Sequence, residues 1–92
     1  MKLIRFSNRA ETQMILRGAK KEEVETAIQS GRWKPAKLEK LMTKYCFEFN
    51  SISPINQKFY KYKIVEPIFA DETNGIIVIT VKVYYSNEEV EI

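Results

Sequence analysis

The stretch KFYKYKIVEPIFADETNGIIVITVKVYY, residues 58–85, decides the fold of this chain. It predicts two long strands joined by a turn at 71–75. The second strand, 76–85, is the most apolar part of the chain and is rich in β-branched residues, which pack well on a pleated surface. We expect one face of this strand to lie under helices, because it is wholly apolar. That face consists of Ile77, Ile79, Val81, Val83 and Tyr85.

The first strand of this hairpin alternates less regularly. Both of its faces mix charged residues with bulky ones, so the pattern does not decide which half faces the helices. Pro67 lies within it, and proline in a strand indicates an edge position or a bulge at which the strand switches sides.

Two helices are predicted upstream. Ser7 is a suitable N-cap for a helix that runs to about Arg17, and Gly18 stands where a helix needs a left-handed residue after its end. A second helix is expected over 21–30, with Val24, Ala27 and Ile28 at the spacing of one buried face. We expect Gly31 to end this helix in the same way as Gly18. The short apolar run at 2–6 indicates an edge strand or a lead-in.

Residues 36–50 fit two patterns. Leu38, Leu41, Met42 and Tyr45 have helical spacing, whereas the residues from Leu41 to Phe49 also alternate as in a strand. We predict a strand over 42–50, because its YCFEF end is strongly β-prone, and leave the lysine-rich part before it open. Trp33 is expected to cover the core, with a stacking platform for a base as the alternative.

These elements predict an α+β fold in one domain over 1–92. A helical hairpin would pack on one face of an antiparallel sheet of three to four strands.

The composition excludes several kinds of chemistry. The 92 residues contain no histidine and a single cysteine, Cys46, so histidine-dependent catalysis, a zinc site and an internal disulfide are not expected. No glycine-rich nucleotide motif is present, and we predict neither cofactor nor metal. Nothing resembles a signal peptide or a membrane-spanning run, so a cytoplasmic protein without membrane contact is the expectation. The net charge of +3 is a mild bias toward anionic partners.

Two stretches resemble a known family. The run RAETQMILRGAKKEEVETAIQSGRW, residues 9–33, is similar to the opening of the family of domains of unknown function called DUF4258. That opening typically reads His-Ala, two residues, Arg-Met, two residues, Arg-Gly-Ile, and then a helix that ends in Gly. The run YKYKIVEPIFADETNGIIVITVKVYY, residues 60–85, resembles the family's closing hairpin. The resemblance covers most of the chain and is weakest over 34–57.

The resemblance implies the α+β fold of the barnase–EndoU–colicin–RelE group, whose members are often metal-independent RNA-cleaving toxins. The chain departs from the family's motif, because Arg9 stands at the histidine position and Gln13 at that of the first arginine. Arg17 and Gly18 keep the motif. A guanidinium stays charged near neutral pH, so Arg9 can hold a phosphate but cannot accept a proton.

Three functions follow as hypotheses. The first is an RNA-cleaving, toxin-like domain, which needs a base, an acid and cations around the phosphate. Its candidates are Arg9, Arg17 and Tyr84 for catalysis and Lys61, Lys63 and Lys82 for binding RNA. The alternatives for these residues are a solvated lysine face, a cap of the first helix by Arg17, and packing of the tyrosine at the rim of the core. Cleavage by these residues requires the six side chains to converge on one concave surface.

The second hypothesis is a non-catalytic module in which the same cations bind RNA or an acidic, antitoxin-like protein. The third is an oligomerising domain, a homodimer paired through an edge strand.

Overall fold

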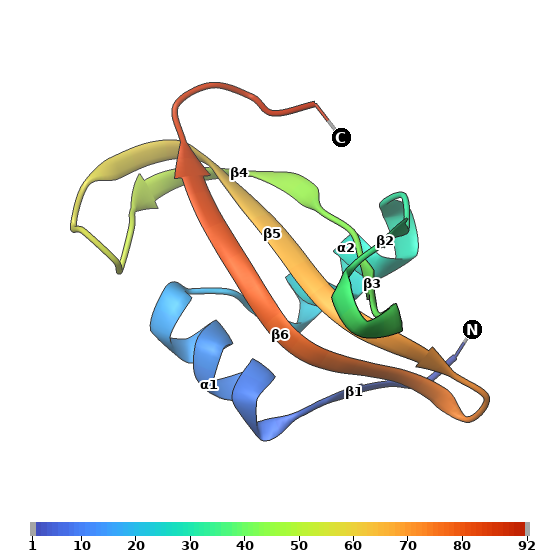
Figure 1. Ribbon diagram of the computed structural model, residues 1–92. Coiled ribbons are helices and arrows are strands. Elements are labelled where there is room, and N and C mark those ends of the chain that lie inside the picture. Colours follow the sequence, from blue (N-terminus) through green and yellow to red (C-terminus); the bar gives the residue numbers. More distant parts are fainter. Residues whose placement is uncertain (1, 92) are drawn as a thin grey trace.

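The computed structural model describes residues 2–91 and has an α+β fold. Two helices, α1 (Asn8–Arg17) and α2 (Lys21–Ser30), pack on a six-stranded sheet. Figure 1 shows β5 and β6 as two long neighbouring ribbons through the centre of the molecule. The strands are β1 (Ile4–Phe6), β2 (Lys34–Pro35), β3 (Leu41–Met42), β4 (Tyr45–Ile52), β5 (Phe59–Glu72) and β6 (Gly75–Ser86).

The sheet is larger than predicted and is mixed. Its order is β1-β6-β5-β3-β2, and β4 also pairs with β5. β1 runs parallel to β6, whereas all other pairs are antiparallel. The prediction of three to four antiparallel strands missed β2, the division of the 42–50 strand into β3 and β4, and the direction of β1. Strands of two or three residues leave almost no periodic signal in a sequence.

A bulge on β6 changes the face that this strand presents to the helices. The pairing steps from Ile68–Thr80 to Phe69–Val78, so Ile79 has no partner on β5. The predicted apolar face is therefore correct for Val81, Val83 and Tyr85 and wrong before the bulge, because one extra residue moves the side chains on its two sides out of register. The predicted change of side exists, but on β6 rather than on β5. The buried apolar side chains of β6 are Ile76 and Val78 before the bulge and Val81 and Val83 after it.

The two helices end differently, although both are followed by glycine. Ser7 caps α1, since its Oγ accepts a bond from the N–H of Ala10 at 3.0 Å, and Gly18 is left-handed with φ 83°, as predicted. Gly31 has an extended backbone with φ −81°, so the prediction of a left-handed residue there is wrong. Glycine is needed at this position for space, because a Cβ would lie 2.6 Å from the carbonyl oxygen of Ala27.

The ambiguous segment 36–50 is mostly extended. Its lysine-rich beginning forms a 3-10 turn, Lys37–Glu39, that joins β2 to β3. The predicted strand is present as β3 and β4, interrupted at Thr43 and Lys44. Thr43 is buried, and its hydroxyl donates to the carbonyl oxygen of Ala27 at 3.4 Å. The interruption therefore docks the strand on the end of α2.

Trp33 covers the edge of the core. Its indole N–H donates to the carbonyl oxygen of Ile28 at 2.8 Å. Its ring meets the ring of Phe69 edge-on, with 5.0 Å between centroids. The main core between helices and sheet is formed by Ala10, Met14, Val24, Ile28, Val65, Phe69, Ile76, Val78, Val81 and Val83.

Candidate functional site

The six residues predicted from the sequence lie on two sides of the sheet. Side chains alternate along a strand, so the buried valines of β5 and β6 determine which neighbours face the helices. Arg9, Arg17, Lys61 and Lys63 lie on the helix side, and Lys82 and Tyr84 lie on the opposite side. The six side chains therefore do not form one surface.

Lys63 is a buried connector between the helices and the sheet. Its ammonium lies 2.8 Å from a carboxylate oxygen of Glu23 and donates to the carbonyl oxygen of Gly18 at 2.8 Å. It also lies 5.2 Å from the centre of the Phe49 ring. With 3% of its surface exposed, Lys63 is not accessible to a ligand such as RNA.

Arg17 lies over the outer edge of β6. Its guanidinium donates to the carbonyl oxygen of Val81 at 3.2 Å. Two residues earlier on β6, the carbonyl oxygen of Ile79 accepts a hydrogen bond from the hydroxyl of Ser7 at 2.9 Å. These carbonyl groups would otherwise be open to pairing with another strand. Arg17 thus protects a sheet edge, a role that the sequence motif does not suggest. Arg9 is exposed on α1, and no interaction of its side chain is found within residues 2–91.

Tyr85 joins the same network from β6. Its hydroxyl donates to the carbonyl oxygen of Arg17 at 2.6 Å. Burial of the ring raises the pKa of Tyr85 above its ordinary value of 10.0, and the negative charge of Glu23 raises it further, while a hydrogen bond with Ser53 acts in the opposite direction. The neutral phenol is therefore the form that the fold stabilises.

This pKa shift predicts a specific loss of stability at alkaline pH. Because the pKa of Tyr85 is higher in the folded than in the unfolded state, its contribution is complete below about pH 10 and is lost as the pH rises through the folded value. We expect the free energy of unfolding to fall more steeply above pH 10 in the parent protein than in Tyr85→Phe. Phenolate absorbance checks the assignment, since one of the five tyrosines should titrate late and be missing from the variant. Five tyrosines that titrate together would contradict it.

The side of the sheet opposite α1 and α2 carries a different set of polar residues. We call this side the helix-free face. Cross-strand pairing places its residues in rows, because partners directly opposite each other point to the same side. One row holds Lys34, Met42, Ile68 and Thr80, the next holds Glu66 and Lys82, and the third holds Cys46, Ile64 and Tyr84.

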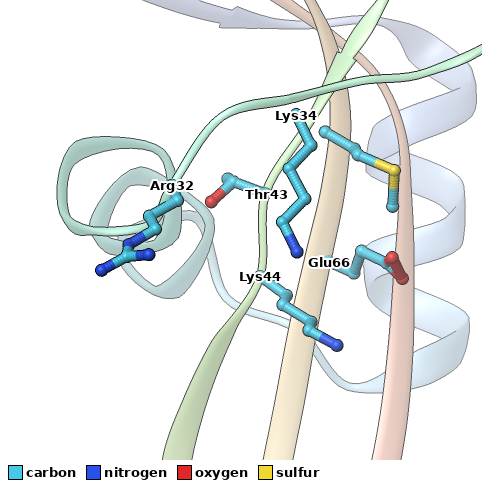
Figure 2. Close-up of a pocket in the computed structure, with 6 residues that line it drawn as sticks. Arg32, Lys34, Thr43, Lys44 and Glu66 are labelled. Carbon is cyan, nitrogen blue, oxygen red and sulfur yellow. The ribbon is translucent and has the colours of Figure 1, made fainter. Parts of the chain in front are cut away.

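A pocket of about 150 Å³ opens beside the middle row. Figure 2 shows Lys34, Lys44 and Glu66 grouped together, while Arg32 extends away from them on the other side of the strand. The pocket is lined by Arg32, Lys34, Met42, Thr43, Lys44 and Glu66. It therefore combines one acidic side chain with three cations, of which Arg32 and Lys34 come from one segment and Lys44 from another.

Glu66 is the most unusual of these residues. Only 9% of its surface is exposed, and its carboxylate makes no ion pair or hydrogen bond with any residue in 2–91. Lys82 lies directly opposite it on β6, yet the two are not in ion-pair contact. The carboxylate is left as a free acceptor in a cationic surrounding.

Sequence reasoning missed Arg32, Lys34, Lys44 and Glu66. One signal was present, because residues 32–44 contain five basic residues and a single acidic one, Glu39. This signal could not be used, because the segment forms only β2, a 3-10 turn and β3, which are too short to be predicted. Without a predicted helix or strand, the basic residues cannot be assigned to one face.

Comparisons of the chain with protein-family models, with curated proteins and with solved structures found no match. The resemblance to DUF4258 and to the RelE-like group therefore stays a prediction. Within residues 2–91, no three histidine, cysteine or acidic side chains are grouped as metal ligands would be. Neither helix is long and apolar enough to cross a membrane.

Proposed function

We propose that this protein is a binding module for single-stranded RNA and that the helix-free face is its RNA-binding surface. The observation that supports this most is the grouping of Lys34, Lys44 and Lys82 from three separate segments on one face. Cations distributed along a groove follow a phosphate backbone, and counterion release supplies much of the affinity.

An exposed aromatic residue favours unpaired nucleotides over a duplex. Tyr84 keeps 51% of its surface exposed and is a diagonal neighbour of Glu66 across the β5–β6 pair. Bases of a single strand can stack on such a ring, whereas bases in a duplex cannot reach it. An acidic protein partner would use the cations but has no need of the ring, so RNA is the better fit.

Cleavage is a second candidate, favoured by one observation. Glu66 supplies a free carboxylate beside Lys34, Lys44 and Lys82, and a base next to cations is what attack by a ribose 2′-hydroxyl requires. Binding is the simpler function, because it needs only the charges and the exposed ring.

The experiment is incubation of the purified protein with total RNA and with a labelled 12-nucleotide RNA in EDTA. We expect retention of intact single-stranded RNA that weakens with salt, with a slope of the logarithmic plot of about −2 to −3, since three or four phosphates are contacted at about 0.7 each. Tight binding that is independent of salt, or no binding at all, would contradict the proposal. Metal-independent cleavage products would establish the second candidate instead, and an acidic protein retained in preference to RNA would favour the other kind of partner.

A further inference from the structure

We propose that Glu66 recognises guanine in the bound strand by accepting hydrogen bonds from its Watson–Crick edge. The inference rests on the proposed RNA binding and adds a base preference to it. Only 9% of the surface of Glu66 is exposed, its carboxylate has no partner within residues 2–91, and the residue lines an open pocket. No fully buried side-chain oxygen without a partner occurs among residues 2–91, so the carboxylate oxygens of Glu66 keep contact with the solvent of the pocket. They are therefore accessible to a ligand that donates hydrogen bonds.

The chemistry of the four bases selects guanine. An ionised carboxylate only accepts hydrogen bonds, and its two oxygens suit two adjacent donors. Guanine presents its N1–H and its exocyclic N2–H side by side. Adenine and cytosine each place a ring-nitrogen acceptor beside their amino group, and uracil has one N–H between two carbonyl groups. Only guanine therefore satisfies both oxygens without placing a lone pair against the carboxylate.

The neighbours of Glu66 fit a nucleotide around that base. Lys34 and Lys44 line the same pocket as Glu66, and Figure 2 shows their side chains near its side chain, so they can hold the phosphates on either side of the base. Met42 adds a polarisable thioether to the pocket wall, a suitable contact for an aromatic ring. Tyr84 lies one row further on the same face and is available to the next base.

The test compares RNA 12-mers of uridine with the same strand carrying one central guanosine, inosine or adenosine. We expect the guanosine strand to bind at least about tenfold more tightly than the uridine strand, as a bidentate contact does in base recognition. Inosine keeps N1–H but lacks the exocyclic amino group, so its strand should fall between the two. Fluorescence anisotropy at fixed ionic strength measures all four affinities.

The variant Glu66→Gln should lose the preference for guanosine without losing affinity for the uridine strand. An amide offers one acceptor and one donor, the pair that adenine requires, so the adenosine strand should gain. Glu22→Gln is the matched control, because Glu22 is exposed in the first turn of α2 on the other side of the molecule. It makes the same change of net charge and should keep the preference for guanosine.

The outcomes separate the two proposals. Equal binding of all four strands by the parent protein would overturn guanine recognition and leave RNA binding intact. No binding of any strand would overturn both. A guanosine preference that persists in Glu66→Gln would show that another group reads the base. The inosine comparison uses the unmodified protein, so the proposal stays testable if the variant does not fold.

Discussion

Replacement of Lys63 by methionine is expected to lower the free energy of unfolding by about 3 kcal/mol, the low end for removing one partner of a buried ion pair. The side chain of Lys63 is 4% exposed and that of Glu23 is 18% exposed, so the carboxylate left behind is only partly hydrated. The substitution also removes the bond to the carbonyl oxygen of Gly18, which lies in the connection between the two helices. Methionine fills a similar volume, so the loss reports the charge rather than a cavity.

Urea unfolding measures this effect, with the midpoint falling and the slope unchanged. Lys61→Met is the matched control, because Lys61 lies two residues earlier on the same side of β5 but is exposed. Its free energy of unfolding should change by less than about 0.5 kcal/mol, as for most surface substitutions. Adding Glu23→Gln to Lys63→Met should recover part of the loss, since it removes the unpaired charge. Equal effects of the two lysine substitutions would refute the assignment of Lys63 as a buried connector.

Neutralising three cations of the helix-free face is expected to weaken RNA binding roughly 10- to 100-fold at low salt. This range follows from up to about 1 kcal/mol for each exposed charge pair. The variant is Lys34→Ala, Lys44→Ala and Lys82→Ala combined. Its salt dependence should also flatten by about 2 in slope, at about 0.7 for each phosphate contact that is lost. None of the three lysines forms an ion pair within residues 2–91, so stability should change little.

The control is a triple variant on the other side of the sheet, Arg9→Ala, Lys20→Ala and Lys61→Ala combined. All three of these side chains are exposed, and the change of net charge is the same. Anisotropy titrations with a uridine 12-mer should give an affinity within about threefold of the parent protein, because long-range charge effects are screened beyond about 10 Å at 0.1 M salt. Equal losses in the two triple variants would indicate non-specific attraction to a cationic protein instead of a defined surface.

The elements with long, regular patterns were predictable from the sequence. Both helices, the cap at Ser7 and the β5–β6 hairpin are where the patterns indicate. The bulge at Ile79 was not predictable, because an unpaired residue inside a run of β-branched residues leaves the composition unchanged. The extended backbone of Gly31 was also missed, and the Thr43 hydroxyl that fills the space beside this glycine comes from a later segment of the chain.

The candidate site was only partly predictable. Lys82 and Tyr84 were identified correctly as sharing one side of the last strand, but Lys63 was assigned as a surface lysine. The alternation of residues along β5 places Lys61 and Lys63 on the same side of the sheet, but it does not show which of the two the helices cover. Glu66 was overlooked because its significance lies in having no partner, a property that only the folded arrangement of its neighbours determines.

The most direct test of the account is to map the RNA contact on the protein by NMR. A ¹⁵N-labelled sample is titrated with the guanosine-containing 12-mer, and the amide shifts are followed residue by residue. We predict that the largest changes fall on β2, on Lys44 and on the segments around Glu66 and Tyr84, with α1 and α2 nearly unchanged. Changes centred on Arg9 and the exposed side of α1, with the helix-free face silent, would contradict the account.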